Sequence, residues 1–137
     1  ATNRALKRDK EDELVIKRLI YDLSKPPPLQ TDLGSCIICY LHFSITELHS
    51  CFRRVKNTLP TGHLLSIEGF RPDQPTFIPK YNSGGPGKVE LLYDPKILQY
   101  ELPDFTIHHS LCFEAMLDDG PGHQGLASIT QMVLEKK

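Results

Sequence analysis

In the first half of the chain, a pattern typical of a strand is followed directly by a pattern typical of a helix. Residues 35–43 are almost continuously apolar and rich in strand-forming side chains, over a length too short for a typical helix. We therefore expect a central strand with both faces buried. Residues 44–47, Ser-Ile-Thr-Glu, match the capping box that begins a helix, and apolar residues then recur every three or four positions up to Leu59. This pattern predicts an amphipathic helix that ends near Pro60.

The second half of the chain reads mainly as short strands separated by proline and glycine turns. Apolar and polar residues alternate from Phe105 to Ala115, which is the pattern of a strand with one buried face. Further strands are expected at 63–68, 89–93 and 97–102, with an edge strand among the prolines of 72–79. One apolar stripe predicts a last helix over about 126–135, formed by Leu126, Ile129, Met132 and Val133.

Three segments make up the predicted organisation. They are an N-terminal helix within residues 1–25, a proline-rich connector over 26–34, and an α+β core over 35–137. At 137 residues they form one domain, and because the sequence begins at Ala1 rather than Met we expect it to be excised from a longer protein. The expected fold class is α+β, with N-terminal, internal and C-terminal helices packed on a largely antiparallel sheet of about five strands.

The composition places limits on where the chain works. No apolar run approaches the roughly 20 residues of a membrane-spanning helix, so no membrane partner is expected. Three of the four cysteines fall inside segments of predicted regular structure, and we interpret them as reduced thiols in an intracellular compartment, cytoplasmic or nuclear.

The spacing of Cys36 and Cys39 is that of half a zinc site. Ile37 and Ile38 continue the predicted strand between them, however, and strand residues three apart point to opposite faces. The expectation is therefore free thiols, with no metal and no cofactor.

A cysteine nucleophile served by a histidine base is the enzymatic alternative. Cys112 and His108 share one face of the predicted strand but lie about 13 Å apart along it, from the strand rise per residue. Cys112 would therefore need His42 or His63 to be brought beside it by the fold.

The glycines and lysine of residues 83–88 invite comparison with a phosphate-binding loop. Such a loop opens into a helix whose N-terminus helps to hold the phosphate, whereas a strand is predicted after Lys88. We interpret the segment as a mobile hairpin loop.

Charge is divided unevenly along the chain. Residues 1–88 hold 13 Lys and Arg against 9 Asp and Glu, whereas residues 89–137 hold 3 against 8. Arg53, Arg54 and Lys56 lie on or beside the exposed face of the capped helix, so they are the candidate residues for a partner or for nucleic acid. The overall charge of −1 is unlike that of a dedicated nucleic-acid binder.

The leading hypothesis is therefore a non-catalytic, intracellular protein-interaction or self-assembly module. It would bind a protein partner or a second copy of itself through complementary charge. The alternatives are a nucleic-acid-binding domain that uses the basic helix face, and the cysteine-histidine enzyme.

Overall fold

The computed structural model describes residues 7, 10–13, 15–16, 34–120 and 122–137. The predicted N-terminal helix falls largely outside these residues, and so does nearly all of the proline-rich connector. The described part is a mixed α+β fold, as the sequence predicts.

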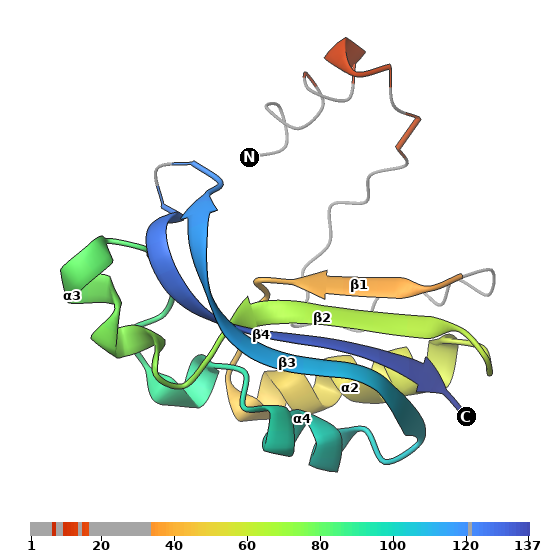
Figure 1. The fold of residues 1–137 in the computed structure, drawn as a ribbon. Helices are drawn as coiled ribbons and strands as arrows, with labels where there is room; N and C mark the ends of the chain where they lie inside the picture. Colours follow the sequence, from red (N-terminus) through yellow and green to blue (C-terminus); the bar gives the residue numbers. More distant parts are fainter. Residues whose placement is uncertain (1–6, 8–9, 14, 17–33, 121) are drawn as a thin grey trace.

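A single four-stranded sheet forms the centre of the fold (Figure 1). Its strands are β1 (Cys36–Cys39), β2 (Leu64–Phe70), β3 (Phe105–Asp118) and β4 (Gln124–Lys136). Their order across the sheet is β1-β2-β4-β3, with β1 parallel to β2 and the other two pairs antiparallel. The expectation of about five strands in a largely antiparallel sheet is therefore only partly met.

Two helices cover one face of this sheet (Figure 1). These are α2 (Ile45–Thr58), which returns from β1 to β2, and α4 (Pro95–Glu101), which precedes β3. A short helix, α3 (Ile78–Tyr81), and two 3₁₀ turns, η1 (Gln74–Thr76) and η2 (Val89–Leu91), fill the connection from β2 to α4. A β-α-β crossover of this kind is the usual way to join parallel strands.

The predicted capping box begins α2. The carboxylate of Glu47 accepts hydrogen bonds from the backbone N–H of Ser44 at 3.0 Å and from the Ser44 hydroxyl at 2.6 Å. The apolar side of α2 then packs through Leu48 and Phe52 against Ile67 and Leu65 of β2. The main core is the layer between the sheet and the helices.

A smaller apolar cluster lies at the end of the sheet nearest α3. It contains the buried residues Phe70, Leu92, Leu117, Ala127 and Ile129. The partly buried Tyr40, Phe113 and Ala115 pack against them.

The last helix of the prediction is wrong. Residues 124–136 form β4, which pairs with β2 on one side and β3 on the other. Residues 127–130 are all buried, so the apolar side chains do not alternate cleanly with polar ones. Periodicity alone cannot distinguish a strand buried on both faces from a helix.

The three predicted strands between residues 72 and 102 are also wrong. Residues 74–76 form a 3₁₀ turn, residues 89–91 form another, and residues 95–101 form α4. Asp94 accepts a hydrogen bond from the backbone N–H of Lys96 at 2.8 Å, and Pro95 occupies the first turn of the helix. Both features are typical of a helix start, and here they outweigh the strand-like composition.

The strand predicted at 105–115 is confirmed as part of β3, with one irregularity. A register shift between Ile107 and His109 interrupts the pairing with β4, so the alternation does not run unbroken. Ile107 packs against the main core, whereas Phe113 belongs to the smaller cluster.

Candidate functional site

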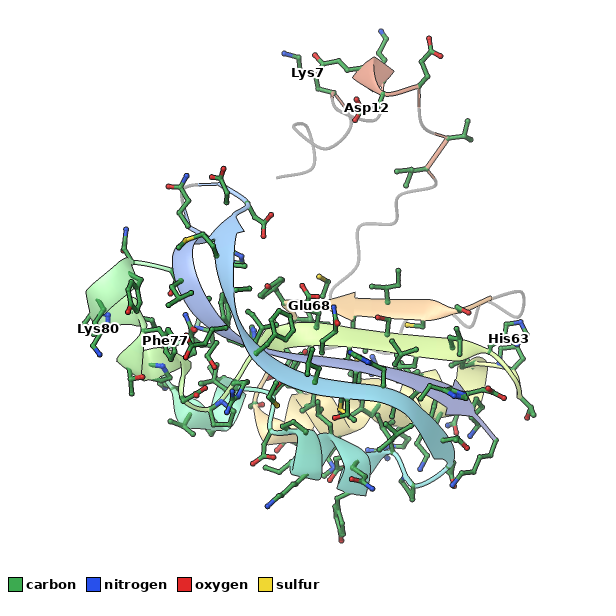
Figure 2. The ribbon with its side chains drawn as sticks, in the orientation of Figure 1. Lys7, Asp12, His63, Glu68, Phe77 and Lys80 are labelled. Atoms are coloured by element: carbon green, nitrogen blue, oxygen red, sulfur yellow. The ribbon has the colours of Figure 1, made fainter. Side chains whose placement is uncertain are left out.

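The carboxyl ends of the two parallel strands meet at one end of the sheet. Figure 2 shows Glu68 near the end of β2, beside the end of β1, and His63 at the opposite end of the sheet. The backbone N–H of Tyr40, directly after β1, donates to the carbonyl of Glu68 at 2.8 Å. In open α/β sheets, ligands bind in the crevice outside the carboxyl ends of the parallel strands. This end of the sheet is therefore the candidate site.

Aromatic side chains gather there, and we name them the aromatic cluster: Tyr40, His42, Phe70, Tyr93 and His123. The ring of Tyr40 lies edge-on to Phe70, with centroids 4.9 Å apart, and to His123 at 5.1 Å. His42 stacks on Phe70 at 5.5 Å. Residues from the segment after β1, from β2, from the connection before α4 and from the β3–β4 turn thus meet at a single place.

Tyr40 adopts an unusual backbone conformation. Its φ angle is +49°, in the left-handed region that bulky residues rarely enter. Such strain persists only where the surrounding structure enforces it, and it is often found at functional sites. Burial, with the nearby carboxylate of Glu68 as the next cause, raises the pKa of the Tyr40 hydroxyl. The phenol therefore stays protonated at neutral pH.

His42 is a structural member of the cluster. Its Nδ1 lies 2.8 Å from the carbonyl of Leu91, and its Nε2 accepts the backbone N–H of Phe70 at 3.3 Å. The Leu91 carbonyl can only accept and the Phe70 amide can only donate, so the ring is neutral with its proton on Nδ1. Burial lowers the pKa of His42, which favours the same neutral form. Neither nitrogen remains available to a substrate.

Tyr93 is held in the cluster by hydrogen bonds to two other segments of the chain. Its hydroxyl donates to the carbonyl of Leu41, and its own carbonyl accepts the Thr130 hydroxyl at 2.7 Å. The ring lies so close to Gly69 that an added Cβ would be 2.7 Å from it. Gly69 is therefore required for the close approach of the ring to β2.

The glycine-rich segment 83–87 is fixed to the sheet, which corrects the prediction of a mobile hairpin loop. Gln74 is fully buried, and its side-chain Nε2 donates to the Ser83 hydroxyl at 2.9 Å and to the Gly84 carbonyl at 2.8 Å. Its Oε1 accepts the backbone N–H of Ser128 at 2.8 Å. The Ser128 hydroxyl donates in turn to Asp73 at 2.6 Å.

Glycines let this segment touch two neighbouring parts of the site. A Cβ on Gly84, where φ is +76°, would lie 1.9 Å from the carbonyl oxygen of Gly122. A Cβ on Gly85 would lie 2.7 Å from the ring of Phe70. Segment 83–87 and the β3–β4 turn thus form one continuous wall beside the aromatic cluster.

The structure also contains an apolar groove of about 420 Å³. It is lined by Leu48, Pro72, Val89, Glu90, Leu92, Asp94, Ile97 and Leu98. Leu92 connects the groove with the aromatic cluster, because it lines the groove and also packs in the smaller core with Phe70. Val89 and Ile97 are about half exposed, so the groove is open to solvent.

The basic residues predicted to bind a partner lie elsewhere. Arg53, Arg54 and Lys56 are in the second half of α2, whereas Leu48, the residue of α2 that lines the groove, is in its first half. Lys56 pairs with Asp104 at 2.8 Å. Arg53 and Lys56 line a hollow of about 250 Å³, which His49 and Glu101 also line, with the His49 ring in contact with the Glu101 carboxylate. The structure does not bring these three residues to the aromatic cluster.

The cysteine-histidine pair is not assembled. The Cys112 sulfur lies 3.9 Å from the Thr130 hydroxyl, and His108 pairs with Glu135 at 2.7 Å. His63 stands at the amino end of β2, and both nitrogens of His42 are occupied. The arrangement therefore gives no support to the Cys112 enzyme.

The two cysteines of the half zinc site are placed apart. Cys36 packs against the main core, whereas Cys39 is exposed. Among the described residues, no three His, Cys, Asp or Glu side chains converge as a metal site would require. The same part of the chain contains no helix that is both long and apolar enough to cross a membrane.

Sequence reasoning missed Tyr40, Gln74 and His123 as residues of the site. Tyr40 was counted as part of an apolar strand, and Gln74 as part of an edge segment. The available signal was the pair of Gly-Pro-Gly triplets at 85–87 and 120–122, because repeated glycine marks places where backbones approach closely.

No protein-family model and no curated protein sequence matches the chain. Solved structures do match it in three dimensions. TehB from Haemophilus influenzae aligns with 96% of the chain at a TM-score of 0.60 and 13% identity. The PH0226 protein from Pyrococcus horikoshii OT3 aligns with 98% at 0.65 and 14% identity. A SAM-dependent methyltransferase from Methanosarcina mazei aligns with 85% at 0.58 and 14% identity.

The chain shares the fold of these proteins. It spans only part of each, namely 44% of TehB, 66% of PH0226 and 65% of the M. mazei methyltransferase. The match with the fold of the M. mazei SAM-dependent methyltransferase overturns the hypothesis of a non-catalytic interaction or self-assembly module. That hypothesis rested on the uneven distribution of charge and the proline-rich edge segment, on the expectation of an excised domain, and on the lack of a catalytic constellation in the sequence. Where a cofactor carries the reactive group, the protein supplies binding and orientation, and no such constellation is needed.

Proposed function

We propose that this chain is part of a SAM-dependent methyltransferase and forms one wall of its active site. The observation that carries the proposal is the aromatic cluster at the carboxyl ends of β1 and β2, within a fold shared with a methyltransferase. S-adenosylmethionine (SAM) supplies a methyl group on a positively charged sulfonium, which a nucleophile on the acceptor can take.

The residues of the cluster fit a sulfonium cation. Aromatic faces attract cations, an effect worth about 0.5–2 kcal/mol and larger where water is excluded. Tyr40 is the best placed ring, because it is partly exposed and held at the end of β1 in a strained conformation. Glu68 and Asp119 lie close enough to Tyr40 to influence its hydroxyl, so they add negative potential.

The apolar groove could bind an apolar part of the molecule that accepts the methyl group. Val89, Leu92 and Ile97 offer apolar surface, with the carboxylates of Glu90 and Asp94 at the same groove. Most small-molecule sites combine such a lining with a few polar groups that set orientation. The hydrogen bonds of His42 to Leu91 and of Tyr93 to Leu41 fix the two rings within the cluster.

The test is binding of SAM by the complete protein that contains this chain. Tyr40→Ala is expected to raise the dissociation constant for SAM about 5- to 30-fold, the equivalent of about 1–2 kcal/mol. Tyr100→Ala is the matched control, because Tyr100 is 82% exposed on α4. Isothermal titration calorimetry measures both. A wild-type protein that does not bind SAM would refute the proposal.

We also propose that the protein works in the cytoplasm or nucleus. All four cysteines are free, which suits a reducing compartment. Labelling of Cys39 and Cys112, the two exposed thiols, in freshly lysed cells would report their redox state.

A further inference from the structure

We propose that His123 is the proton acceptor for the nucleophile that takes the methyl group. The inference rests on the proposed function and adds a residue role to it. His123 lies in the turn between β3 and β4, with its ring centroid 5.1 Å from that of Tyr40 and 5.4 Å from that of Phe70. It is half-buried at the carboxyl ends of the parallel strands, next to the proposed sulfonium position.

No hydrogen bond from the described part of the chain occupies either nitrogen of the His123 imidazole. Among the described residues it makes ring contacts with Tyr40 and Phe70, while only its backbone forms hydrogen bonds, to Gly120 and Asp119. A half-buried imidazole packed edge-on against two aromatic rings can still hydrogen-bond a molecule that enters beside them. Imidazole is also the side chain best suited to exchange a proton near neutral pH.

The other five histidines are engaged or distant. His42 uses both nitrogens within the fold, and His49 and His108 pair with Glu101 and Glu135. His63 lies at the amino end of β2, and His109 is exposed opposite Val133 in the middle of the β3–β4 ladder. As far as the described residues show, His123 is the one histidine that combines a place in the aromatic cluster with ring nitrogens that make no hydrogen bond.

Glycine contacts fix the backbone that carries His123. The carbonyl of Gly122 is in close contact with Gly84, and an added Cβ on Gly84 would lie 3.6 Å from the His123 ring. Gln74 holds Gly84 in turn through its bond to the Gly84 carbonyl. A base must be held within hydrogen-bonding reach of the proton that it removes, and this chain of contacts provides such support.

The step balances without any further reactant. The acceptor nucleophile, a thiol, amine or hydroxyl, forms a bond to the methyl carbon as the bond from that carbon to the sulfonium sulfur breaks. The sulfonium becomes a neutral thioether, and the proton of the nucleophile passes to a ring nitrogen of His123. The titratable groups that face this ring are the Tyr40 hydroxyl and the neutral His42, with Asp119 in the same turn.

The experiment uses the complete protein that contains this chain, with SAM as donor and thiophenol, benzylamine and phenol as acceptor probes. Formation of S-adenosylhomocysteine is followed from pH 5.5 to 9. His123→Gln is expected to lower turnover about 100-fold or more and to remove the rise of the rate on the acid side. The affinity for SAM should change far less than the turnover. His109→Gln, an exposed histidine of β3, should behave as wild type.

A second readout does not depend on turnover. In histidine-labelled protein, at least one of the three probes is expected to shift the ring resonances of His123 and leave those of His109 in place. A His123→Gln variant with wild-type rate and pH profile would overturn the inference. So would a protein that binds SAM but whose His123 resonances respond to none of the probes, and in that case the proposed function would stand. A wild-type protein that does not bind SAM would refute both the inference about His123 and the proposed function.

Discussion

The side-chain oxygen of Gln74 lies 2.8 Å from the backbone nitrogen of Ser128, which ties the connection after β2 to the middle of β4. On its other side the same amide group donates to Ser83 and to the Gly84 carbonyl. Gln74 and Ser83 are both fully buried. One glutamine therefore fixes the glycine-rich segment to the sheet, and with it the wall of the candidate site.

Replacing Gln74 tests this connection. In Gln74→Glu the side chain can still accept from Ser128, but a carboxylate cannot donate to Ser83 and Gly84. We expect the free energy of unfolding to fall by about 2 kcal/mol or more, because two buried acceptors lose their donor and a charge is buried. Urea denaturation measures the change.

The control is Gln99→Glu, which makes the same chemical change at an exposed position of α4. Its effect should stay within about 0.5 kcal/mol. Equal effects of the two substitutions would contradict the role assigned to Gln74.

The elements that could be predicted are those defined by neighbours in the sequence. The capping box at Ser44 and Glu47 acts within one helical turn, and the alternation from Phe105 to Ala115 describes a strand directly. Asp94 and Pro95 also carried a helix-start signal, although the prediction gave more weight to the apolar residues that follow. Local chemistry was therefore sufficient for the start of α2 and for β3, whereas α4 was wrongly predicted as a strand.

The elements that could not be predicted depend on the whole sheet. Ile129 and Met132 fit a helical spacing of apolar residues because β4 lies between β2 and β3 and is buried on both faces. Its apolar residues therefore do not alternate with polar ones. Tyr40 and His123 are 83 positions apart in the sequence, and no pattern relates them until β1, β2 and the β3–β4 turn are placed together. The candidate site forms because the topology of the sheet brings these distant segments together.

Gly84→Ala should damage the fold locally at the wall of the site. The new Cβ would lie 1.9 Å from the carbonyl oxygen of Gly122, and the φ of +76° disfavours any L side chain. We expect a loss of about 2 kcal/mol or more in the free energy of unfolding. Gly87→Ala is the control, since nothing lies within 4 Å of its added Cβ. A Gly84→Ala variant that melts at the wild-type temperature would rule out the tight contact.

The buried His42 should make stability depend on pH. An unfolded histidine titrates near pH 6.5, and burial lowers the pKa of His42 in the folded chain. Between these two values the unfolded chain binds more protons, so the contribution of His42 is present above about pH 6.5 and is lost as the pH falls through the folded pKa.

Urea denaturation at pH 7.5 and pH 5 measures this contribution. His42→Gln should be less stable than wild type at pH 7.5, by about 1–3 kcal/mol, and should lose less stability on acidification. His109→Gln, at an exposed position, should keep the wild-type pH dependence. If His42→Gln and wild type lose the same stability between the two pH values, the buried neutral imidazole is not the cause.

Tyr93→Phe tests the hydrogen bond that holds Tyr93 in the aromatic cluster. The substitution keeps the ring against Gly69 but removes the hydroxyl that donates to the Leu41 carbonyl, just beyond the end of β1. Because Tyr93 is almost completely buried, we expect the unpaired carbonyl to lower the free energy of unfolding by about 1–2 kcal/mol. Tyr100→Phe removes the same atom from an exposed side chain and should have almost no effect.

The backbone amides of residues 40–42 should also exchange with solvent faster in Tyr93→Phe alone, since the hydroxyl holds the segment that positions both Tyr40 and His42. Unchanged exchange there, together with wild-type stability, would show that the hydroxyl contributes nothing to the site.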